Sequence, residues 1–237
     1  MIRDVGGSYR KAIVETVHHY SGQRPSPESI DALKAEGCWN NDWEASLELL
    51  RRQGQQDLPA FEALVEVFNG FYFGGDPEGD PAAWTGFIRN EPLLVDAALF
   101  ASLSAADVAW GFVSGAEPPS ARFVLQTRLG LEQPPLIAMG EAPDKPDPSG
   151  FLRLASALAP PSVPVAYLGD TVADITTVVR ARQAKPDQRF ISLAVAPPHL
   201  HSSPRRAAYE DQLRQAGADV VIPGTTAVLG ALEQAIA

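Results

Sequence analysis

The chain has 237 residues, which is enough for one large domain or for one domain that carries a smaller insertion. Its 19 Lys and Arg residues stand against 29 Asp and Glu residues, so the net charge is −10 and the pI is about 4.8. This acidic balance argues against nucleic acid or an anionic membrane surface as the partner, although a small anionic ligand is compatible with it.

The single cysteine, Cys38, excludes an internal disulfide framework and a cysteine zinc cluster, and it suits a reducing cytoplasm. No apolar run reaches the length of a membrane span, because Asp96 and Asp107 interrupt the most hydrophobic region. The N-terminus becomes polar within three residues and shows no signal segment. We therefore expect a cytoplasmic protein without a membrane partner. The sequence leaves open whether it is a monomer or a dimer.

The first part of the chain, to about residue 90, predicts helices alone. Apolar residues recur at helical spacing over 9–20, 43–50 and 61–72, and Ser26-Pro27 has the form of a cap followed by proline at the first helical position. We interpret the aromatic stripe of 61–72 as the core of a helical bundle. The Gly- and Pro-rich segment 74–81 predicts a loop.

From residue 91 the pattern alternates between helix and strand. Strands are expected over 108–113, 136–139, 163–168, 190–195 and 219–222. Helices are expected over 92–103, 119–129, 148–158, 171–184, 204–216 and 225–236. Such alternation predicts an α/β fold, in which a Rossmann-like, doubly wound parallel sheet carries helices on both faces.

Two carboxylates follow the strand expected over 163–168. Gly169-Asp170 ends the strand, and Asp174 comes one helical turn later on the same side. Ligands of open parallel sheets bind at the carboxyl ends of strands, so the pair could hold a hard cation such as Mg²⁺. In the alternative interpretation, Asp170 caps the helix and Asp174 only favours its positive end.

Two other strands also end on groups that suit phosphate chemistry. Ser114-Gly115 ends the strand expected over 108–113, where a hydroxyl beside a small backbone can donate hydrogen bonds to a phosphoryl oxygen. The alternative is that Ser114 caps the next helix. Lys145 lies between Asp144 and Pro146 after the strand expected over 136–139, where a fixed ammonium could neutralise a phosphate.

Hydroxyl, lysine and acidic pair, in this order at successive strand ends, resemble the haloacid dehalogenase superfamily. The resemblance covers essentially the whole chain and is closest to the branch whose helical cap is inserted after the first core strand. It implies an α/β core formed by residues 1–7 and 89–237, with an inserted helical cap domain over 8–88. It also implies that Ser114 and Gly115 bind phosphate and that Lys145, in Lys-Pro-Asp-Pro, stabilises the phosphorylated intermediate. Asp170 and Asp174 then serve Mg²⁺.

The family's first strand and its Asp-x-Asp-Gly motif have no counterpart in the sequence. That motif supplies the nucleophile and the general acid and base, and a covalent aspartyl-phosphate mechanism cannot run without its carboxylate. Asp4 comes too late to replace it, because on the family's register Met1 falls on the residue after the motif. Arg3 and Asp4 either face the substrate from the hinge or form only a hinge turn.

Two hypotheses follow from this pattern. In the first, the complete protein is a Mg²⁺-dependent phosphate monoester hydrolase acting on a small phosphorylated metabolite, and the sequence starts late. We then expect the chain as printed to be inactive and poorly folded, because the missing strand would be the central one, between those that end at Ser114 and Asp170. In the second, the chain is a pseudoenzyme that binds a phosphorylated ligand without chemistry. An oxidoreductase of Rossmann type is disfavoured, because no glycine fingerprint is present.

Overall fold

The computed structural model describes residues 1–36, 39 and 41–236. Cys38 lies outside them, so the interpretation of its thiol stays a prediction. The chain divides into two compact units: a helical unit, Val5–Pro92, and a sheet unit, Met1–Asp4 with Leu93–Ala237. The helical unit begins three residues earlier and ends four residues later than the segment 8–88 expected as a cap.

The helical unit contains the four helices that the sequence predicted, and two short 3₁₀ turns follow them. They are α1 (Tyr9–Ser21), α2 (Pro27–Ala35), α3 (Asp42–Arg52), α4 (Phe61–Tyr72), η1 (Pro81–Ala83) and η2 (Phe87–Asn90). The Ser26 cap is confirmed, because its side chain accepts a hydrogen bond from the Ser29 amide at the start of α2. The aromatic stripe of α4 is also confirmed as core, since Phe68 and Tyr72 are buried and Tyr9 stacks on Tyr72 with ring centroids 4.1 Å apart.

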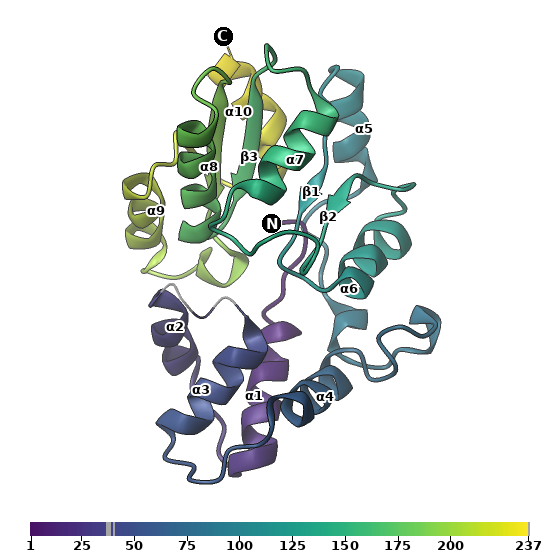
Figure 1. The fold of residues 1–237 in the computed structure, drawn as a ribbon, viewed down its shortest axis with the longest axis vertical. Helices are drawn as coiled ribbons and strands as arrows, with labels where there is room; N and C mark the ends of the chain where they lie inside the picture. The colour runs from purple at the N-terminus through teal and green to yellow at the C-terminus, as the bar shows by residue number, and fades with distance from the viewer. Residues whose placement is uncertain (37–38, 40, 237) are drawn as a thin grey trace. The chain divides into compact units, whose positions relative to one another are not determined.

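The sheet unit alternates strands with helices, as predicted (Figure 1). The strands are β1 (Phe112–Val113), β2 (Leu136–Ile137), β3 (Val165–Gly169), β4 (Phe190–Val195) and β5 (Val220–Ile222). The helices are α5 (Ala97–Ala105), α6 (Pro118–Arg122), the π-helical η3 (Phe123–Arg128), α7 (Ser149–Leu158), α8 (Val172–Ala184), α9 (Arg206–Gln215) and α10 (Val228–Ile236), with the short turns η4 (Pro198–Leu200) and η5 (Thr225–Ala227).

Several expected boundaries are wrong, and local hydrogen bonding explains one of them. The helix expected from residue 92 begins only at α5, because Asp96 is its N-cap and accepts the Ala98 amide, whereas Leu93 forms an antiparallel bridge with Arg3. The helix expected over 119–129 changes from α-helical to π-helical at Phe123. The first two strands are shorter than expected, at two residues each.

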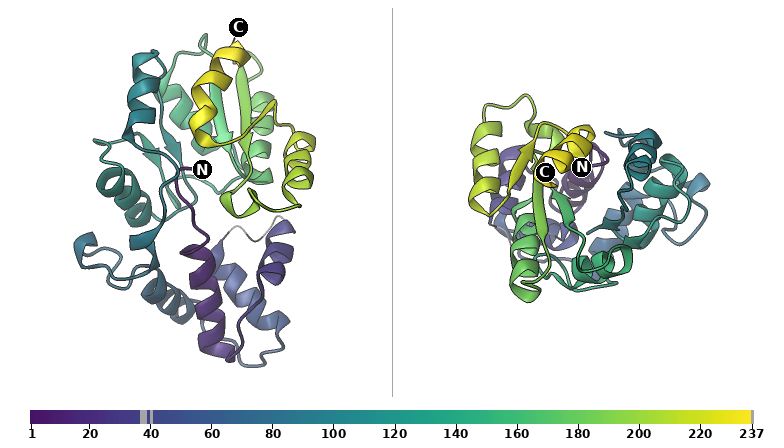
Figure 2. Two further views of the ribbon diagram at one scale, coloured as in Figure 1. Left: turned by 180° about the vertical axis from the view of Figure 1, so that it is seen from behind. Right: turned by 90° about the horizontal axis from the view of Figure 1, so that it is seen from above.

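All strand pairs are parallel, but the strands form two separate sheets. In one, β4 lies between β3 and β5, with Val165 opposite Phe190 and Leu193 opposite Val220. In the other, β1 pairs with β2 alone. In the two opposite views of Figures 1 and 2, α8 covers one face of the three-stranded sheet and α10 covers the other. Within the described chain, no strand pairing joins β1 to β3.

The strands β1 and β3 are less buried than β4. Every residue of β4 is buried, whereas both residues of β1 and three of the five in β3 are only partly buried. Phe112 of β1 and Leu168 of β3 nevertheless pack into one hydrophobic cluster, together with Ile2. A buried strand in a parallel sheet is normally paired on both sides, so the open sides of β1 and β3 are a distinctive feature of this unit.

None of the helices in the described chain combines the length and the apolar character that crossing a bilayer requires.

Hydrogen exchange should show the open side of β3 directly. The Val165 amide donates to Arg189 O at 2.9 Å, so alternation along the strand turns the Ala166 and Leu168 amides away from β4. We expect these two amides to exchange about ten-fold faster than that of Tyr167, which corresponds to a hydrogen bond worth about 1–1.5 kcal/mol. Amide exchange followed by NMR is the measurement. Equal protection along β3 would show that its outer side is covered.

Candidate functional site

Asp174 is held at the start of α8 by a capping box. Thr171 is the N-cap, and its hydroxyl accepts the Asp174 amide at 3.1 Å. In return, Asp174 Oδ2 accepts hydrogen bonds from the Thr171 amide and hydroxyl at 3.1 and 2.8 Å. The alternative in which Asp170 caps this helix is therefore wrong. Asp174 does lie in the first turn, where the helix dipole favours a negative charge.

Lys145 forms a close ion pair with Asp174. Lys145 Nζ lies 2.6 Å from Asp174 Oδ1, and the side chains are 24% and 2% exposed. The Tyr167 hydroxyl donates to the same oxygen at 3.1 Å, and the Asp170 amide donates to Oδ2 at 3.2 Å. With the two bonds from Thr171, five donors compensate the buried carboxylate.

The ion pair fixes the charge of both partners. Burial would raise the pKa of the Asp174 carboxyl, but the Lys145 ammonium and the other donors hold that pKa below its ordinary value. Burial would likewise lower the pKa of Lys145, but the negative charge of Asp174 raises it above its ordinary value. A fixed ammonium therefore lies beside the carboxyl end of β3 at neutral pH.

The glycine at the end of β3 makes this arrangement sterically feasible. A Cβ atom added at Gly169 would lie 2.2 Å from Asp174 Cβ, so any other residue would displace the carboxylate. The Gly-Asp-x-x-x-Asp spacing thus has a physical cause: Asp174 folds back over the strand end, and only glycine leaves room for it.

Asp170 has different surroundings from Asp174. Its side chain is 27% exposed, and its Oδ2 atom lies 3.5 Å from the Met1 amino group. Its backbone carbonyl accepts a hydrogen bond from the Tyr209 hydroxyl at 2.7 Å. Asp174 would have to release donors in order to bind a cation, whereas the Asp170 carboxylate is accessible to one.

The donor set of Asp170 suits a cation that keeps most of its water. Among the described residues, no group of three or more His, Cys, Asp or Glu side chains gathers in a way that could hold a metal. Mg²⁺ is commonly bound through one or two carboxylates, with water and substrate phosphate completing its shell. Asp170 fits that pattern.

Ser114 and Gly115 lie where the sequence predicted, directly after β1. The Ser114 hydroxyl accepts the Ala116 amide at 3.0 Å, and the N-cap of the following α6 is Glu117. The alternative in which Ser114 caps that helix is therefore wrong. Gly115 is exposed, and a Cβ atom there would meet nothing within 4 Å. Within the described chain, no hydrogen bond or ion pair links Ser114 to Lys145, so their shared role stays a prediction.

Neither the ion pair between Lys145 and Asp174 nor three further contacts in this region were predicted from the sequence. Thr171 had a readable signal, since Thr-x-x-Asp before an apolar segment is a capping-box spacing. Tyr167 was interpreted as part of a buried strand, and nothing in the spacing showed that its hydroxyl reaches Asp174. Tyr209 lies 39 positions beyond Asp170, and no local pattern connects the two.

Arg3 donates a hydrogen bond to the Ser120 hydroxyl at 3.2 Å, which neither favours nor excludes contact with a substrate.

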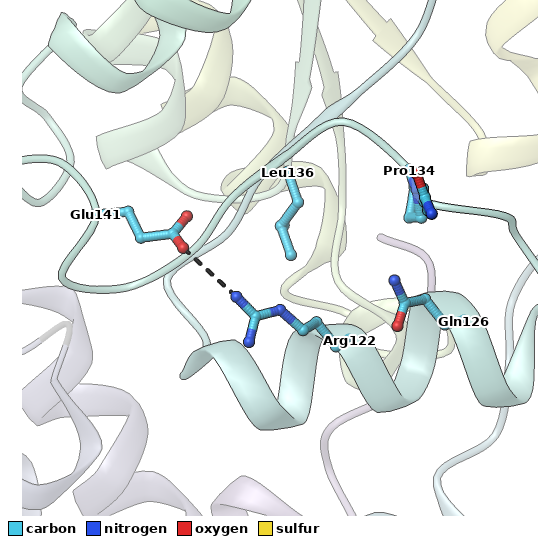
Figure 3. Close-up of a pocket in the computed structure, with 6 residues that line it drawn as sticks. Arg122, Gln126, Pro134, Leu136 and Glu141 are labelled. Carbon is cyan, nitrogen blue, oxygen red and sulfur yellow. Dashed lines mark ion pairs between the residues drawn. The ribbon is translucent and has the colours of Figure 1, made fainter. Parts of the chain in front are cut away.

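A surface hollow of about 240 Å³ lies elsewhere in the sheet unit (Figure 3). It is lined by Arg122, Gln126, Gln133, Pro134, Leu136 and Glu141. Arg122 and Glu141 form an ion pair across it at 3.8 Å, which Figure 3 marks with a dashed line. None of the residues predicted to bind phosphate or metal lines it.

No family model matches the sequence. The chain is 29% identical over 233 residues to a protein of Phytophthora nicotianae named imidazoleglycerol-phosphate dehydratase. The match covers 94% of this chain but only 48% of that protein, so the chain spans about half the length of this curated relative.

Solved structures give the fold. A haloacid dehalogenase-like hydrolase of Bacteroides fragilis superposes with a TM-score of 0.67 at 15% identity, covering 96% of this chain and 94% of the other. For a protein of Thermotoga maritima named as a beta-phosphoglucomutase, the TM-score is 0.63 at 14% identity, with 98% and 94% covered. For a subfamily IA hydrolase of Geobacter sulfurreducens, it is 0.53 at 12% identity, with 98% and 91% covered. The chain thus has the α/β fold of the haloacid dehalogenase-like hydrolases, as predicted.

Replacing only one partner of the ion pair should lower the free energy of unfolding. Asp174→Asn leaves the Lys145 ammonium without its counter-charge, which should destabilise the protein by about 3 kcal/mol. Asp170→Asn is the matched control and should change stability by no more than about 0.5 kcal/mol, because Asp170 is partly exposed. Urea unfolding at neutral pH measures both. Equal stability of the two variants would show that Asp174 is not compensated in the way described.

The same pair predicts a pH profile. The Asp174 pKa is lowered, so its contribution to stability is present above the ordinary carboxyl pKa of about 4 and is lost as the pH falls through the lowered value. The Lys145 pKa is raised, so its contribution is present below about 10.4 and is lost only at higher pH. The unfolding free energy of wild type minus that of Lys145→Met/Asp174→Asn should therefore be flat from about pH 5 to 9. A steady slope across that range would contradict this pairing.

Proposed function

We propose that this protein is a Mg²⁺-dependent phosphate monoester hydrolase that acts on a small phosphorylated metabolite once a carboxylate nucleophile is in place. The observation that carries the proposal is the buried ion pair between Lys145 and Asp174, directly beside the accessible carboxylate of Asp170. The haloacid dehalogenase fold supports it, because its solved neighbours include hydrolases.

Each residue has a role that follows from its surroundings. Lys145 is held by Asp174 and presents a permanent positive charge to the phosphoryl group. Gly115 has open space beside it, so its backbone can approach a phosphoryl oxygen, to which the Ser114 hydroxyl can donate. Asp174 acts through Lys145 and is therefore a positioning residue in this proposal.

Asp170 is the residue that would hold Mg²⁺. When bound there, the ion would offset negative charge on the phosphoryl oxygens and help to orient the ester. Asp170 needs no further protein ligand for this role, because water and the phosphate oxygens can complete an octahedral shell. The Asp170 amide donates a hydrogen bond to Asp174 Oδ2, and this bond links the position of Asp170 to the ion pair.

The nucleophile needs a place that β1 and β3 can provide. Both strands lack a partner on one side within the described chain, both are partly buried, and their side chains share one hydrophobic cluster. We propose that a parallel strand ending in Asp-x-Asp-Gly completes the sheet there. One carboxylate oxygen would attack phosphorus while the bond to the ester oxygen breaks. The second Asp would protonate the departing alkoxide, and water would then hydrolyse the aspartyl phosphate.

The alternative function is binding without chemistry. A phosphorylated ligand could be held by Lys145 and Ser114 even if no nucleophile is ever present. What favours this alternative is that the sequence contains no Asp-x-Asp-Gly motif. The two functions differ in one measurable way, because the binding protein releases no phosphate in any form of the chain.

Phosphate release decides between them. The 237-residue chain should be inactive, and a version preceded by a parallel strand ending in Asp-x-Asp-Gly should hydrolyse p-nitrophenyl phosphate with Mg²⁺. In the active form, Lys145→Ala should lower turnover by about 10²–10³-fold, because one preorganised electrostatic group is lost. Arg122→Ala is the control, since Arg122 lies at a separate hollow. An extended form that binds phosphate but never releases it would establish the binding protein.

The substrate panel should include imidazoleglycerol phosphate, because the name of the Phytophthora relative contains that phosphate ester. The chain spans about half of that protein, so its dehydratase activity need not reside in the shared part. Release of inorganic phosphate from this ester, compared with simple sugar phosphates, would define the substrate class.

A further inference from the structure

A tyrosine from a distant helix holds the backbone of the proposed metal ligand. The Tyr209 hydroxyl on α9 donates to the carbonyl oxygen of Asp170 at 2.7 Å. The Tyr209 ring packs beside the buried residues Ile175 and Leu213, and this packing restrains the position of its hydroxyl.

A second tyrosine holds the other end of the same turn. The Tyr167 hydroxyl donates to Asp174 Oδ1 at 3.1 Å, beside the bond from Lys145. Its side chain is 7% exposed, and its ring packs edge-on against Phe151 with centroids 5.0 Å apart. Tyr167 therefore reaches the carboxylate from inside the core.

The two hydroxyls act on different groups of the turn. The Asp170 carbonyl belongs to the peptide plane between Asp170 and Thr171, so the bond from Tyr209 restrains the backbone that directs the Asp170 side chain. The bond from Tyr167 instead restrains the Asp174 carboxylate, and through it the Lys145 ammonium. Partners of this kind, one step removed from a metal, commonly set the orientation of its ligands.

We propose that Tyr209 is a positioning residue for cation binding at Asp170 and that Tyr167 is a positioning residue for phosphate binding at Lys145. This assignment rests on the proposed function of the site, and it divides the turn into two separately supported halves. It predicts that removing one hydroxyl weakens one ligand more than the other.

The first test does not depend on any ligand. Tyr209→Phe and Tyr167→Phe each remove only a hydroxyl, and amide exchange of the peptide containing residues 170–174 reports on the turn. Both variants should exchange faster there than wild type. Tyr20→Phe is the matched control, because the Tyr20 hydroxyl also donates to a backbone carbonyl, that of Ala63 at 3.0 Å, in the helical unit. Unchanged exchange of the turn in both variants would overturn the proposal.

The second test measures binding of Mg²⁺ and of inorganic phosphate by calorimetry, on the 237-residue chain and on the strand-extended version. Tyr209→Phe should lower the affinity for Mg²⁺ by about ten-fold and the affinity for phosphate by a smaller factor. Tyr167→Phe should lower the affinity for phosphate by about ten-fold and the affinity for Mg²⁺ by a smaller factor. Tyr20→Phe should leave both affinities unchanged.

The outcomes separate this inference from the proposed function. Faster exchange with the crossed pattern of affinities supports both. If wild type binds neither Mg²⁺ nor phosphate in either form, the proposed function fails, whereas faster exchange in the two variants would still establish the tyrosines as supports of the turn. If both variants lose both ligands equally, or neither, the division of roles is wrong.

Discussion

A carboxylate whose side chain is only 2% exposed needs close compensation, and Asp174 receives it from five donors. The rest of the candidate site depends on this one compensated charge. Lys145 is held in place by it, and the backbone after β3 is folded around it through the Asp170 and Thr171 amides. Gly169 is needed because the carboxylate lies over it. The Gly-Asp-x-x-x-Asp segment thus compensates the buried charge of Asp174. In the same arrangement, Asp170 stays accessible beside the Lys145 ammonium.

The second constraint comes from the sheets. Parallel strands normally satisfy their backbone groups on both sides, and β4 does so while being fully buried. The strands β1 and β3, which end directly before Ser114 and Asp170, each have one side without a strand partner in the described part of the chain. The groups assigned to phosphate and to metal therefore follow strands that each have one unpaired side, and both strands contact the same hydrophobic cluster. Under the proposed function, their relative placement depends on the strand that we propose completes the sheet.

Much of the fold could be predicted from sequence because it depends on local periodicity. The helices of the helical unit, the order of strands and helices in the sheet unit, and the strand-end positions of Lys145 and Asp170 all follow from apolar spacing and from Gly and Pro. The late start of α5 could not be predicted in this way, because it depends on the Asp96 cap and on the pairing of Leu93 with Arg3. The change to π-helix at Phe123 has no signal in the apolar spacing.

The site shows the same division between local and distant contacts. The pairing of Lys145 with Asp174 was not predicted from the sequence, since 29 residues separate them and no local pattern connects them. The roles of Tyr167 and Tyr209 depend on where a hydroxyl points in three dimensions. No periodicity encodes that direction, so these residues were interpreted from sequence as ordinary core or helix.

The proposed function requires that Ser114, Lys145 and Asp170 serve one bound phosphate and its cation. A crystal structure of the strand-extended protein with Mg²⁺ and orthovanadate, which is an analogue of the phosphoryl group in transfer, tests it most directly. We expect vanadate oxygens to lie within hydrogen-bond distance of both Lys145 Nζ and Ser114 Oγ, with Mg²⁺ on the Asp170 carboxylate. Vanadate bound at another place, such as the hollow beside Arg122, or held by Lys145 without Ser114 and Asp170, would contradict it.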